Sequence, residues 1–386
     1  MDEMVAPLIS DHLVNLSDSL EPQPALAVSW RHDTDFKRWE FQLRPGVKFH
    51  DGSPFTVALA AEALERLTAV AEANALVIRS ERPAPRLLFE LAGIPIWKRG
   101  AGQTVIGIGP FRLTANEWPR RVVFTANEDY WGGRPYLDAI EIETGRTLRD
   151  QFLDFEANKV DIIELGFGDA RRPMQNGRKI WISPPVDLIA IEFGPSAGER
   201  VREAIALSID RTTIHNVLLQ KQGTPAASLL PQWLSGNAFL FTVVRDLERA
   251  RQLGAGAAPV ALAYDVRDLM ARSIAERIAV NAREAGIVIR PIVAGAQAQN
   301  ARIVRIRLGS PDPGQALASV NAALGPEKTA HDSPEAVYAA ERALLKDRRI
   351  VPLFHVPEIY GLGPRVRGWA PSRWGGWKLE SVWLAP

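Results

Sequence analysis

A single stretch near the start of the chain constrains its fold more than any other, because a strand, a tight turn and a helix start follow one another there. Residues 39–43 alternate apolar and polar side chains, the pattern of a half-buried strand. A Pro-Gly pair at 45–46 supplies a turn into the extended residues 47–49. Thr56 is suited to cap a helix, which we predict over residues 57–70. The chain should therefore contain a hairpin followed by a helix.

The second half of the chain alternates helical and extended patterns. Asp246 is suited to cap a helix over 247–253, and the apolar residues 257–264 are extended. A four-residue apolar spacing then predicts a helix that ends at Gly286, followed by a strand over 287–292. Alternating helices and strands indicate α/β layers. Elsewhere the sequence predicts a strand near 87–89, a helix over 149–158, an apolar strand over 160–165 and an extended stretch over 180–193.

Composition excludes several classes of protein and site. The 386 residues are enough for two or three domains. Because 46 basic residues balance 45 acidic ones, the net charge of +1 gives no electrostatic case for binding nucleic acid. Cysteine is absent, so we expect no disulfide, thiol nucleophile or thiolate metal site. The six histidines lack the spacing of a helical metal site, which leaves only a site assembled from distant parts of the chain, and we expect neither a metal nor a cofactor.

The chain also lacks the motifs of common enzyme classes. It has no Gly-x-Ser-x-Gly elbow, no phosphate-binding loop and no His-Glu-x-x-His helix. The Gly-Ile-Gly-Pro segment at 107–110 lacks the third glycine of a dinucleotide fingerprint, so a turn is the better interpretation. We therefore predict that the protein is not an enzyme.

Four segments occur in an order that is typical of one family. They are the Trp-ending segment and hairpin at 26–56, the glycine-proline segment at 107–113, the Asn-Glu-Asp-Tyr-Trp-Gly-Gly turn at 127–138, and the helix at 201–211 that ends in Asp-Arg. Together they resemble the family 5 extracellular solute-binding proteins, the oligopeptide-, dipeptide- and nickel-binding receptors of bacterial ABC importers. The resemblance spans nearly the whole chain.

The resemblance implies an α/β, two-lobe, periplasmic-binding-protein type II fold similar to cluster C, with a shortened subdomain and discontinuous lobes. Lobe I would contain residues 1–48, 105–220 and 350–386, and lobe II would contain residues 221–349. Residues 49–104 would form a small subdomain packed on lobe I. Repeated crossings between lobes form a hinge, and such receptors close around their ligand.

The implied function is that of a solute-binding receptor, which closes on a small solute and delivers it to the permease subunits of an ABC transporter. We expect a monomer that binds no nucleic acid and is periplasmic, or membrane-tethered and extracellular. The family's signal peptide and first strand are absent from this sequence, which starts at Met1. A cytoplasmic ligand-sensing module on the same fold is therefore an alternative, and an enzyme that reuses the fold is a second one.

One departure from the family bears on the ligand. Peptide-binding relatives carry an acidic residue four positions before the proline of an Asp-Pro or Glu-Pro pair, and its carboxylate captures the α-ammonium of the peptide. Gly309 occupies this position before Pro313, and Asp312 fits a turn or helix cap. An ammonium without a counter-charge in a closed site is strongly disfavoured. We therefore expect a neutral or anionic solute that is not anchored as a peptide N-terminus.

The other candidate ligand contacts lie mainly in Pro- and Gly-rich loops or on the strand expected near 350–355, since loops on a rigid scaffold are where binding residues concentrate. Each competes with a structural interpretation, because buried aromatic rings most often serve packing. With Gly309, the candidates are Trp233, Ser310, His355, Arg373, Trp374 and Trp377.

Overall fold

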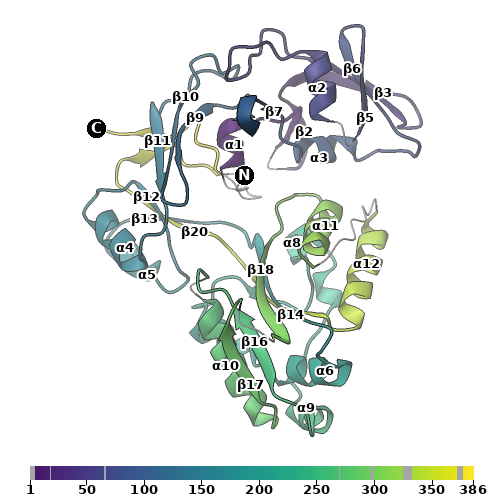
Figure 1. Cartoon of the computed structure of the whole chain (residues 1–386), viewed down its shortest axis with the longest axis vertical. Helices are drawn as coiled ribbons and strands as arrows, with labels where there is room; N and C mark the ends of the chain where they lie inside the picture. The colour runs from purple at the N-terminus through teal and green to yellow at the C-terminus, as the bar shows by residue number, and fades with distance from the viewer. Residues whose placement is uncertain are drawn as a thin grey trace. The chain divides into compact units, whose positions relative to one another are not determined.

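The chain folds into two compact units in the computed structural model (Figure 1). Unit 1 comprises Met1–Asp161 and Gly363–Pro386, and unit 2 comprises Ile162–Leu362. The chain thus passes between the units twice. The structure describes residues 5–386 except 18, 65–66, 269, 296–298, 325–332 and 372–376. Among the described residues, no helix has both the length and the apolar character that crossing a membrane requires.

Unit 1 opens with the predicted hairpin and helix. The hairpin strands join an antiparallel sheet in the order β3-β4-β6-β5, and helix α2 (Val57–Ala63) packs on β5 and β6. The Thr56 side chain accepts a hydrogen bond from the Leu59 amide at 3.3 Å, which confirms the predicted cap. The strands are β3 (Ala27–His32), β4 (Arg38–Leu43), β5 (Thr68–Glu72) and β6 (Ala75–Arg79).

Two secondary-structure predictions in this region are wrong. The predicted helix over 57–70 ends at Ala63, because residues 68–72 instead form β5 and pair with β6. The predicted strand near 87–89 is helix α3 (Leu87–Ala92). Leu87 and Leu91 are both buried, four residues apart, so this short apolar run follows helical and not strand periodicity.

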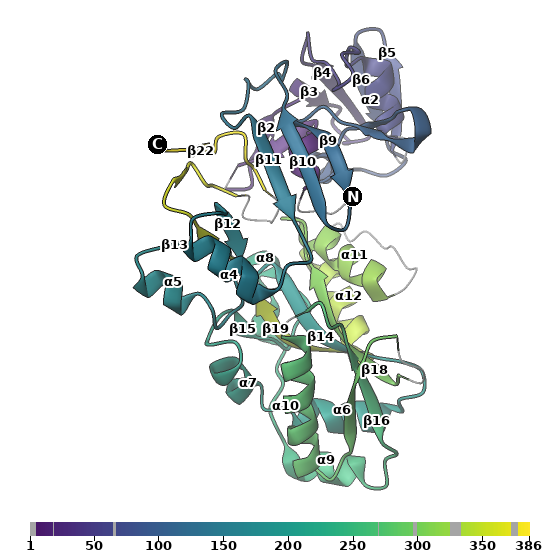
Figure 2. The same ribbon diagram turned by 60° about the vertical axis from the view of Figure 1, so that its left-hand side comes forward.

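The rest of unit 1 is built from small sheets and short helices. A three-stranded antiparallel sheet has the order β11-β10-β9, and it is seen in full in Figure 2. Its strands are β9 (Phe111–Glu117), β10 (Arg121–Ala126) and β11 (Ala139–Glu143). The other elements are α1 (Ala6–Ile9), β1 (Val14–Leu16), β2 (Pro22–Pro24), β7 (Lys98–Arg99), η1 (Ala101–Gln103), β8 (Val105–Ile106), α4 (Leu148–Glu156), β21 (Val366–Arg367) and β22 (Trp383–Leu384).

The glycine-proline segment is a place where two stretches of backbone touch. The Ile9 carbonyl accepts hydrogen bonds from the amides of Ile108 and Gly109 at 2.9 and 3.0 Å. A Cβ atom on Gly107 would lie 1.6 Å from the same carbonyl oxygen. The sequence motif therefore requires glycine because no side chain fits between the two segments.

Gly107→Ala should lower the free energy of unfolding by about 2 kcal/mol or more, because the clash is with backbone that cannot rotate away. Gly198→Ala is the matched control, since a Cβ there meets no atom within 4 Å and the backbone φ is −64°. Its expected loss is below about 1 kcal/mol. Urea unfolding measures both, and equal losses for the two variants would contradict the close-approach explanation.

Unit 2 contains the α/β layers predicted from the second half of the chain. Its main sheet has the order β15-β19-β14-β18-β16-β17. Asp246 caps α9 (Leu247–Gly254) through the Arg249 amide, as predicted, and α10 (Ala271–Glu284) packs on β16 and β17. The strands are β14 (Asp187–Phe193), β15 (Thr224–Pro225), β16 (Val260–Tyr264), β17 (Ile289–Val293), β18 (Ala301–Arg307) and β19 (Ile350–Val356).

A second sheet of unit 2 has the order β12-β20-β13 and is antiparallel. Its strands are β12 (Ile162–Glu164), β13 (Lys179–Ile182) and β20 (Ile359–Leu362). The helices of unit 2 are α5 (Arg171–Gln175), α6 (Glu199–Ser208), α7 (Arg211–Val217), α8 (Gln232–Ser235), η2 (Ala238–Leu240), α9 (Leu247–Gly254), α10 (Ala271–Glu284), α11 (Pro313–Leu324) and α12 (Pro334–Lys346).

The division into units differs from the expected lobe boundaries. Strand β14 pairs with β18 on one side and with β19 on the other, so strands expected in different lobes form one sheet. The boundaries expected near 220 and 350 accordingly fall inside unit 2. In unit 1, residues 49–104 share one hydrophobic core with the preceding strands, in which Phe41, Phe49 and Leu76 are fully buried.

Candidate functional site

The loop after β18 contains two of the candidates from the sequence. Gly309 is exposed and has a φ of +48°, a conformation that favours glycine. The Ser310 hydroxyl accepts a hydrogen bond from the Asp312 amide at 3.1 Å and donates one to Gln315 at 3.0 Å. The Asp312 carboxylate accepts the Gln315 amide at 2.9 Å at the start of α11, as expected of a cap. Asp312 therefore serves the backbone here.

The other candidates are in different surroundings. His355 is buried in β19, and its Nε2–H donates to the Leu229 carbonyl at 3.1 Å. Burial lowers the pKa of His355 to about 4, so the ring is neutral at pH 7. Trp233 is 38% exposed and donates to the Pro185 carbonyl, whereas Trp377 is half-buried in unit 1. Arg373 and Trp374 lie outside the described residues.

A buried ion network that the sequence reasoning missed lies where β14, β18 and β19 meet. Asp187, with its side chain only 4% exposed, is opposite Arg307 in the β14–β18 ladder. The Asp187 oxygens lie 2.7 Å from Arg305 Nε and 2.8 Å from Arg307 Nε. Arg307 also forms an ion pair with Glu358, whose amide donates to the Ser183 hydroxyl at 2.8 Å. One carboxylate therefore holds two guanidinium groups.

The network continues onto the second sheet of unit 2. The Tyr360 hydroxyl donates to Glu358 at 3.2 Å, and the Tyr360 ring stacks on Trp181 with centroids 5.9 Å apart. Glu164 on β12 is directly opposite Tyr360, and Trp181 on β13 is opposite it on the other side. Directly opposite residues share one face of a sheet. A row of one carboxylate and two aromatic rings thus adjoins the ion network.

Electrostatics distinguish the members of the polar face of unit 2, which we define as the ion network together with the adjoining row: Asp187, Arg305, Arg307, Glu358, Glu164, Tyr360 and Trp181. Burial, the largest single cause, disfavours the charged forms of Arg305 and Arg307, but the acidic neighbours together, Asp187 first among them, outweigh it, and the pKa of both guanidinium groups is raised. Glu164 keeps contact with solvent, yet neighbouring atoms crowd its carboxylate, and this desolvation raises its pKa while Arg305 opposes the shift. Glu164 is therefore harder to ionise than an ordinary surface glutamate.

A sequence signal for this face exists. Residues 187–193 read as an apolar strand apart from Asp187 and Glu192, and residues 301–307 place Arg305 and Arg307 two positions apart, on one face of a strand. Charged side chains within apolar strands are rarely buried without partners. Their pairing partners, however, come from distant parts of the chain.

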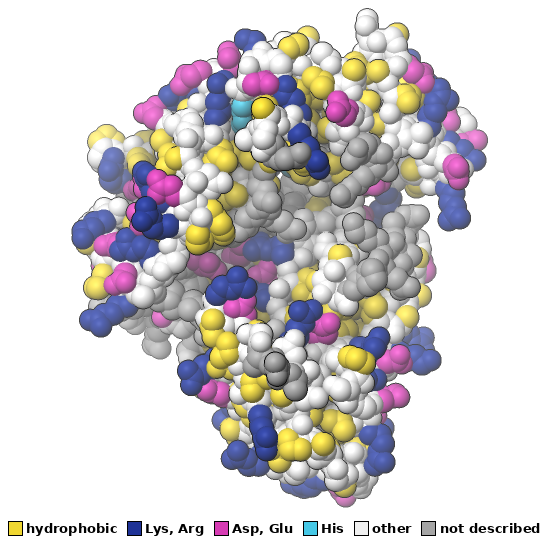
Figure 3. Space-filling model, in the orientation of Figure 1, with side chains coloured by type: hydrophobic (Ala, Val, Ile, Leu, Met, Phe, Trp, Pro, Cys, Tyr) yellow, Lys and Arg dark blue, Asp and Glu magenta, His cyan; other side chains and the backbone are white. Residues whose placement is uncertain are grey.

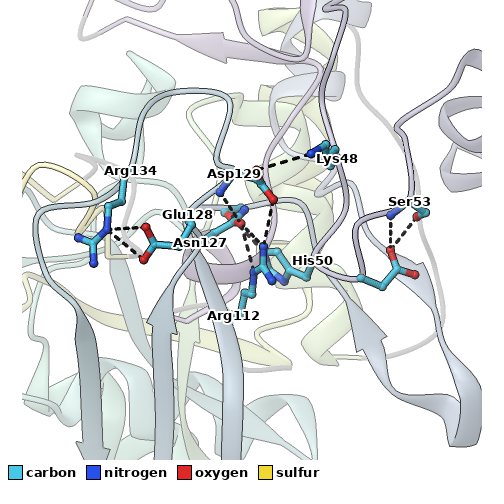
Figure 4. Close-up of polar contacts among 10 residues, drawn as sticks. Lys48, His50, Ser53, Arg112, Asn127, Glu128, Asp129 and Arg134 are labelled. Atoms are coloured by element: carbon cyan, nitrogen blue, oxygen red, sulfur yellow. Dashed lines mark hydrogen bonds and ion pairs between the residues drawn. The ribbon is translucent and has the colours of Figure 1, made fainter.

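Motif residues in unit 1 form a framework of polar contacts instead (Figure 4). The Gly109 carbonyl accepts hydrogen bonds from His50 Nε2 and from the Asn127 side chain, both at 3.0 Å. Asn127 Oδ1 in turn accepts two hydrogen bonds from the Arg112 guanidinium, and Asp129 lies 3.6 Å from Lys48. These contacts join the motifs at 26–56, 107–113 and 127–138 to one another. In this structure the residues that make them have a structural role.

Two further surface features do not form a binding site. A hollow of about 580 Å³ on unit 2 is lined by Glu203 and Leu207 of α6, residues 244–249 around the start of α9, and Arg348. Glu203 in it is already paired with Arg249 at 2.7 Å and with Arg348 at 3.5 Å. Basic and acidic side chains are likewise intermixed over the face drawn in Figure 3. Within the described part of the chain, no cluster of three or more His, Asp or Glu side chains is arranged to hold a metal ion.

Comparison with curated proteins gives a consistent result. The family model described as bacterial extracellular solute-binding proteins, family 5 Middle, matches residues 21–79 and 69–287. The nickel-binding protein NikA of Staphylococcus aureus is 23% identical over 244 residues, which cover 57% of this chain and 50% of that protein. The nickel-binding periplasmic protein of Escherichia coli is 25% identical over 271 residues, which cover 60% and 52%. The matched region thus spans about half the length of these relatives.

Solved structures share the fold over the whole chain. The crystal structure of Staphylococcus aureus NikA in complex with Ni(L-His)2 matches with a TM-score of 0.84 at 18% identity, covering 100% of this chain and 96% of that one. The substrate-binding domain of an oligopeptide ABC transporter from Bacillus anthracis has the same TM-score and identity, with 100% and 94% covered. The two-lobe, type II α/β fold expected from the sequence is confirmed.

Proposed function

Because this chain belongs to the family 5 bacterial extracellular solute-binding proteins, we propose that it is a receptor that binds a small solute and delivers it to the permease subunits of an ABC importer. The observation that carries the proposal is the family match over most of the chain, residues 21–287. The protein acts outside the cytoplasm as a monomer, and it binds its solute without converting it.

The polar face of unit 2 supports this function and supplies the candidate binding residues. Ligand sites in proteins combine a few oriented polar groups with aromatic and apolar walls. Here the exposed members Arg305 and Glu164 flank a core of fixed ion pairs, and Trp181 lies in the same row as Glu164. Ser310 and Gly309, which follow the same strand as Arg307, remain candidate contacts from the sequence.

Native mass spectrometry of the protein purified without denaturation tests the receptor function. We expect a small molecule to travel with the protein and, when it is added back, to raise the midpoint of thermal unfolding. At a concentration about 100 times its Kd, a ligand adds about 2.7 kcal/mol to the free energy of unfolding. The receptor function would be contradicted if no compound is found with the protein and if the small-molecule filtrate of a cell extract does not raise the midpoint of its thermal unfolding.

Two further measurements separate the receptor from the alternatives: incubation of the protein with the recovered compound, and cell fractionation. An enzyme on this fold would convert the recovered compound on incubation, whereas a receptor releases it with unchanged mass. A cytoplasmic sensing module would bind the compound but would remain with the cytoplasm when cells that express the native gene are fractionated. An exported receptor is instead recovered from the periplasmic or surface fraction.

A further inference from the structure

A short buried loop in unit 2 is fixed by side chains and not by secondary structure. Leu229 and Leu230 are both 0% exposed. Their amides donate to Glu341 Oε1 on α12, at 3.0 Å for Leu230. The Leu229 carbonyl accepts a hydrogen bond from His355 Nε2 on β19, and the Leu230 carbonyl accepts one from the Ser228 hydroxyl. Side chains therefore satisfy all four backbone polar groups of these two residues.

The Glu341 carboxyl is buried with one oxygen engaged and the other free. The residue is 0% exposed, and Oε2 has no hydrogen-bond partner among the described residues. A neutral carboxyl tolerates such a place better than a carboxylate, because the charge would lose its hydration and gain only two amide donors. Burial accordingly raises the pKa of Glu341 to about 7, against the effect of the two amides. A charge on Glu341 is relieved when the loop moves and water reaches Oε2.

The surroundings of Glu341 offer it no counter-charge. Helix α11 packs against α12 (Figure 1), and neither α11 nor residues 224–235 contain a titratable side chain. Leu188 and Ile306 lie in the core beneath these helices, so Asp187 and Arg307, which alternate with them, point to the other face of the sheet. The titratable side chains on the near face and on α12 are His355, the Glu192–Arg302 ion pair, Glu335, Tyr338, Arg342 and Lys346. In the described part of the chain none of them pairs with Glu341, and burial lowers the pKa of His355 to about 4, so that ring is uncharged.

The loop leads directly into a candidate ligand contact. Helix α8 begins two residues after Leu230. It carries Trp233, which is 38% exposed and donates to the Pro185 carbonyl at 2.9 Å. Leu234 of the same helix packs in one core with Leu230. The place of the Trp233 ring therefore depends on how firmly the loop before it is held.

We propose that Glu341 is a positioning residue that clamps this loop when it is protonated and releases it when it is ionised, so that pH sets how firmly Trp233 is held. The consequence for solute binding rests on the proposed receptor function, with Trp233 as a candidate contact. Between pH 4.5 and 7 the open loop loses the Glu341 proton and the closed loop keeps it, so opening becomes more favourable as pH rises. Above pH 7 both forms are ionised and the effect levels off.

Hydrogen–deuterium exchange of the solute-free protein from pH 4.5 to 8 tests the clamp. The readout is the protection factor, which is corrected for the intrinsic pH dependence of exchange, in peptides covering 226–236 and, as the reference, 187–193 of β14. Protection of the loop should fall by about 300-fold between pH 4.5 and 7 and then level off, since 7 − 4.5 = 2.5 pH units separate the closed and open forms. At every pH it should be at least about tenfold below that of β14, because the loop opens without global unfolding.

Two variants assign the effect to Glu341. Glu341→Gln cannot titrate but keeps an oxygen for the two amides, so its loop protection should stay within about threefold over the same range. Glu335→Gln, on the exposed first turn of the same helix, should keep the fall of the parent protein.

Three outcomes would overturn the clamp. Loop protection that does not change with pH in the parent protein removes the coupling to a proton, and this measurement decides even if Glu341→Gln does not fold. Equal protection of the loop and β14 shows that the loop opens only with the whole unit. The same fall in Glu341→Gln assigns the proton to another group. Because no solute is present, each of these results is independent of whether the receptor function holds.

Discussion

Asp187→Asn is expected to lower the free energy of unfolding by about 2–3 kcal/mol, because the partly exposed Arg305 loses its counter-charge and Arg307 keeps only its ion pair with Glu358. Asp187 is 4% exposed at its side chain, and Arg305 and Arg307 are 31% and 23% exposed. Removing one partner of a buried pair is more damaging than replacing the whole pair, since the remaining charges stay desolvated. Urea unfolding at pH 7 measures the loss.

The same two strands provide a matched control at their other end. Glu192 is opposite Arg302 in the β14–β18 ladder, and their side chains are 21% and 48% exposed. Because solvent screens this pair, Glu192→Gln should cost less than about 1 kcal/mol. If Asp187→Asn costs no more than this control, the ion network is a surface feature and not a buried structural element.

The parts of the fold that the sequence predicted are those set by local patterns. The alternating residues 39–43 lie within β4, Thr56 and Asp246 cap helices, and the helix–strand alternation of unit 2 is present. Each of these depends on side chains within a few residues of one another. The error at Leu87–Ala92 has the same origin, because a short apolar run fits a strand and a buried helix equally well.

The candidate site was less predictable because it is made by distant pairings. Asp187 and Arg305 are 118 residues apart in the chain, and Arg307 and Glu358 are 51 apart. Single-strand periodicity shows that such side chains are charged but not which partner they meet. The ligand contacts expected from loop position, such as Trp233, stay predictions. His355, a candidate ligand contact from the sequence, is buried and donates a hydrogen bond to a backbone carbonyl, and the sequence alone does not show this.

Glu341 is expected to make the stability of this protein fall as pH rises from about 4.5 to about 7. Its side chain is fully buried on α12, where Oε1 accepts the backbone amides of Leu229 and Leu230. Oε2 has no hydrogen-bond partner among the described residues. Burial raises the pKa of Glu341 to about 7 and outweighs the two amide hydrogen bonds, which lower it.

The sign follows from proton binding. Between the ordinary pKa of 4.5 and the native value of about 7, the native state holds a proton on Glu341 that the unfolded chain has released. A rise in pH through this window therefore favours the unfolded chain, by up to about 3 kcal/mol in total.

The Glu341→Gln variant tests this assignment, because its side chain cannot titrate but keeps an oxygen for the two amides. The fall in the free energy of unfolding that Glu341 causes between pH 4.5 and 7 in the parent protein should therefore be missing from the variant. Urea unfolding at pH 5, 6, 7 and 8 gives the comparison, with Glu335→Gln on the exposed start of the same helix as the control. Parallel stability curves for the parent and Glu341→Gln would show that Glu341 is ionised in the native state throughout, and the assignment of a buried, protonated carboxyl would be wrong.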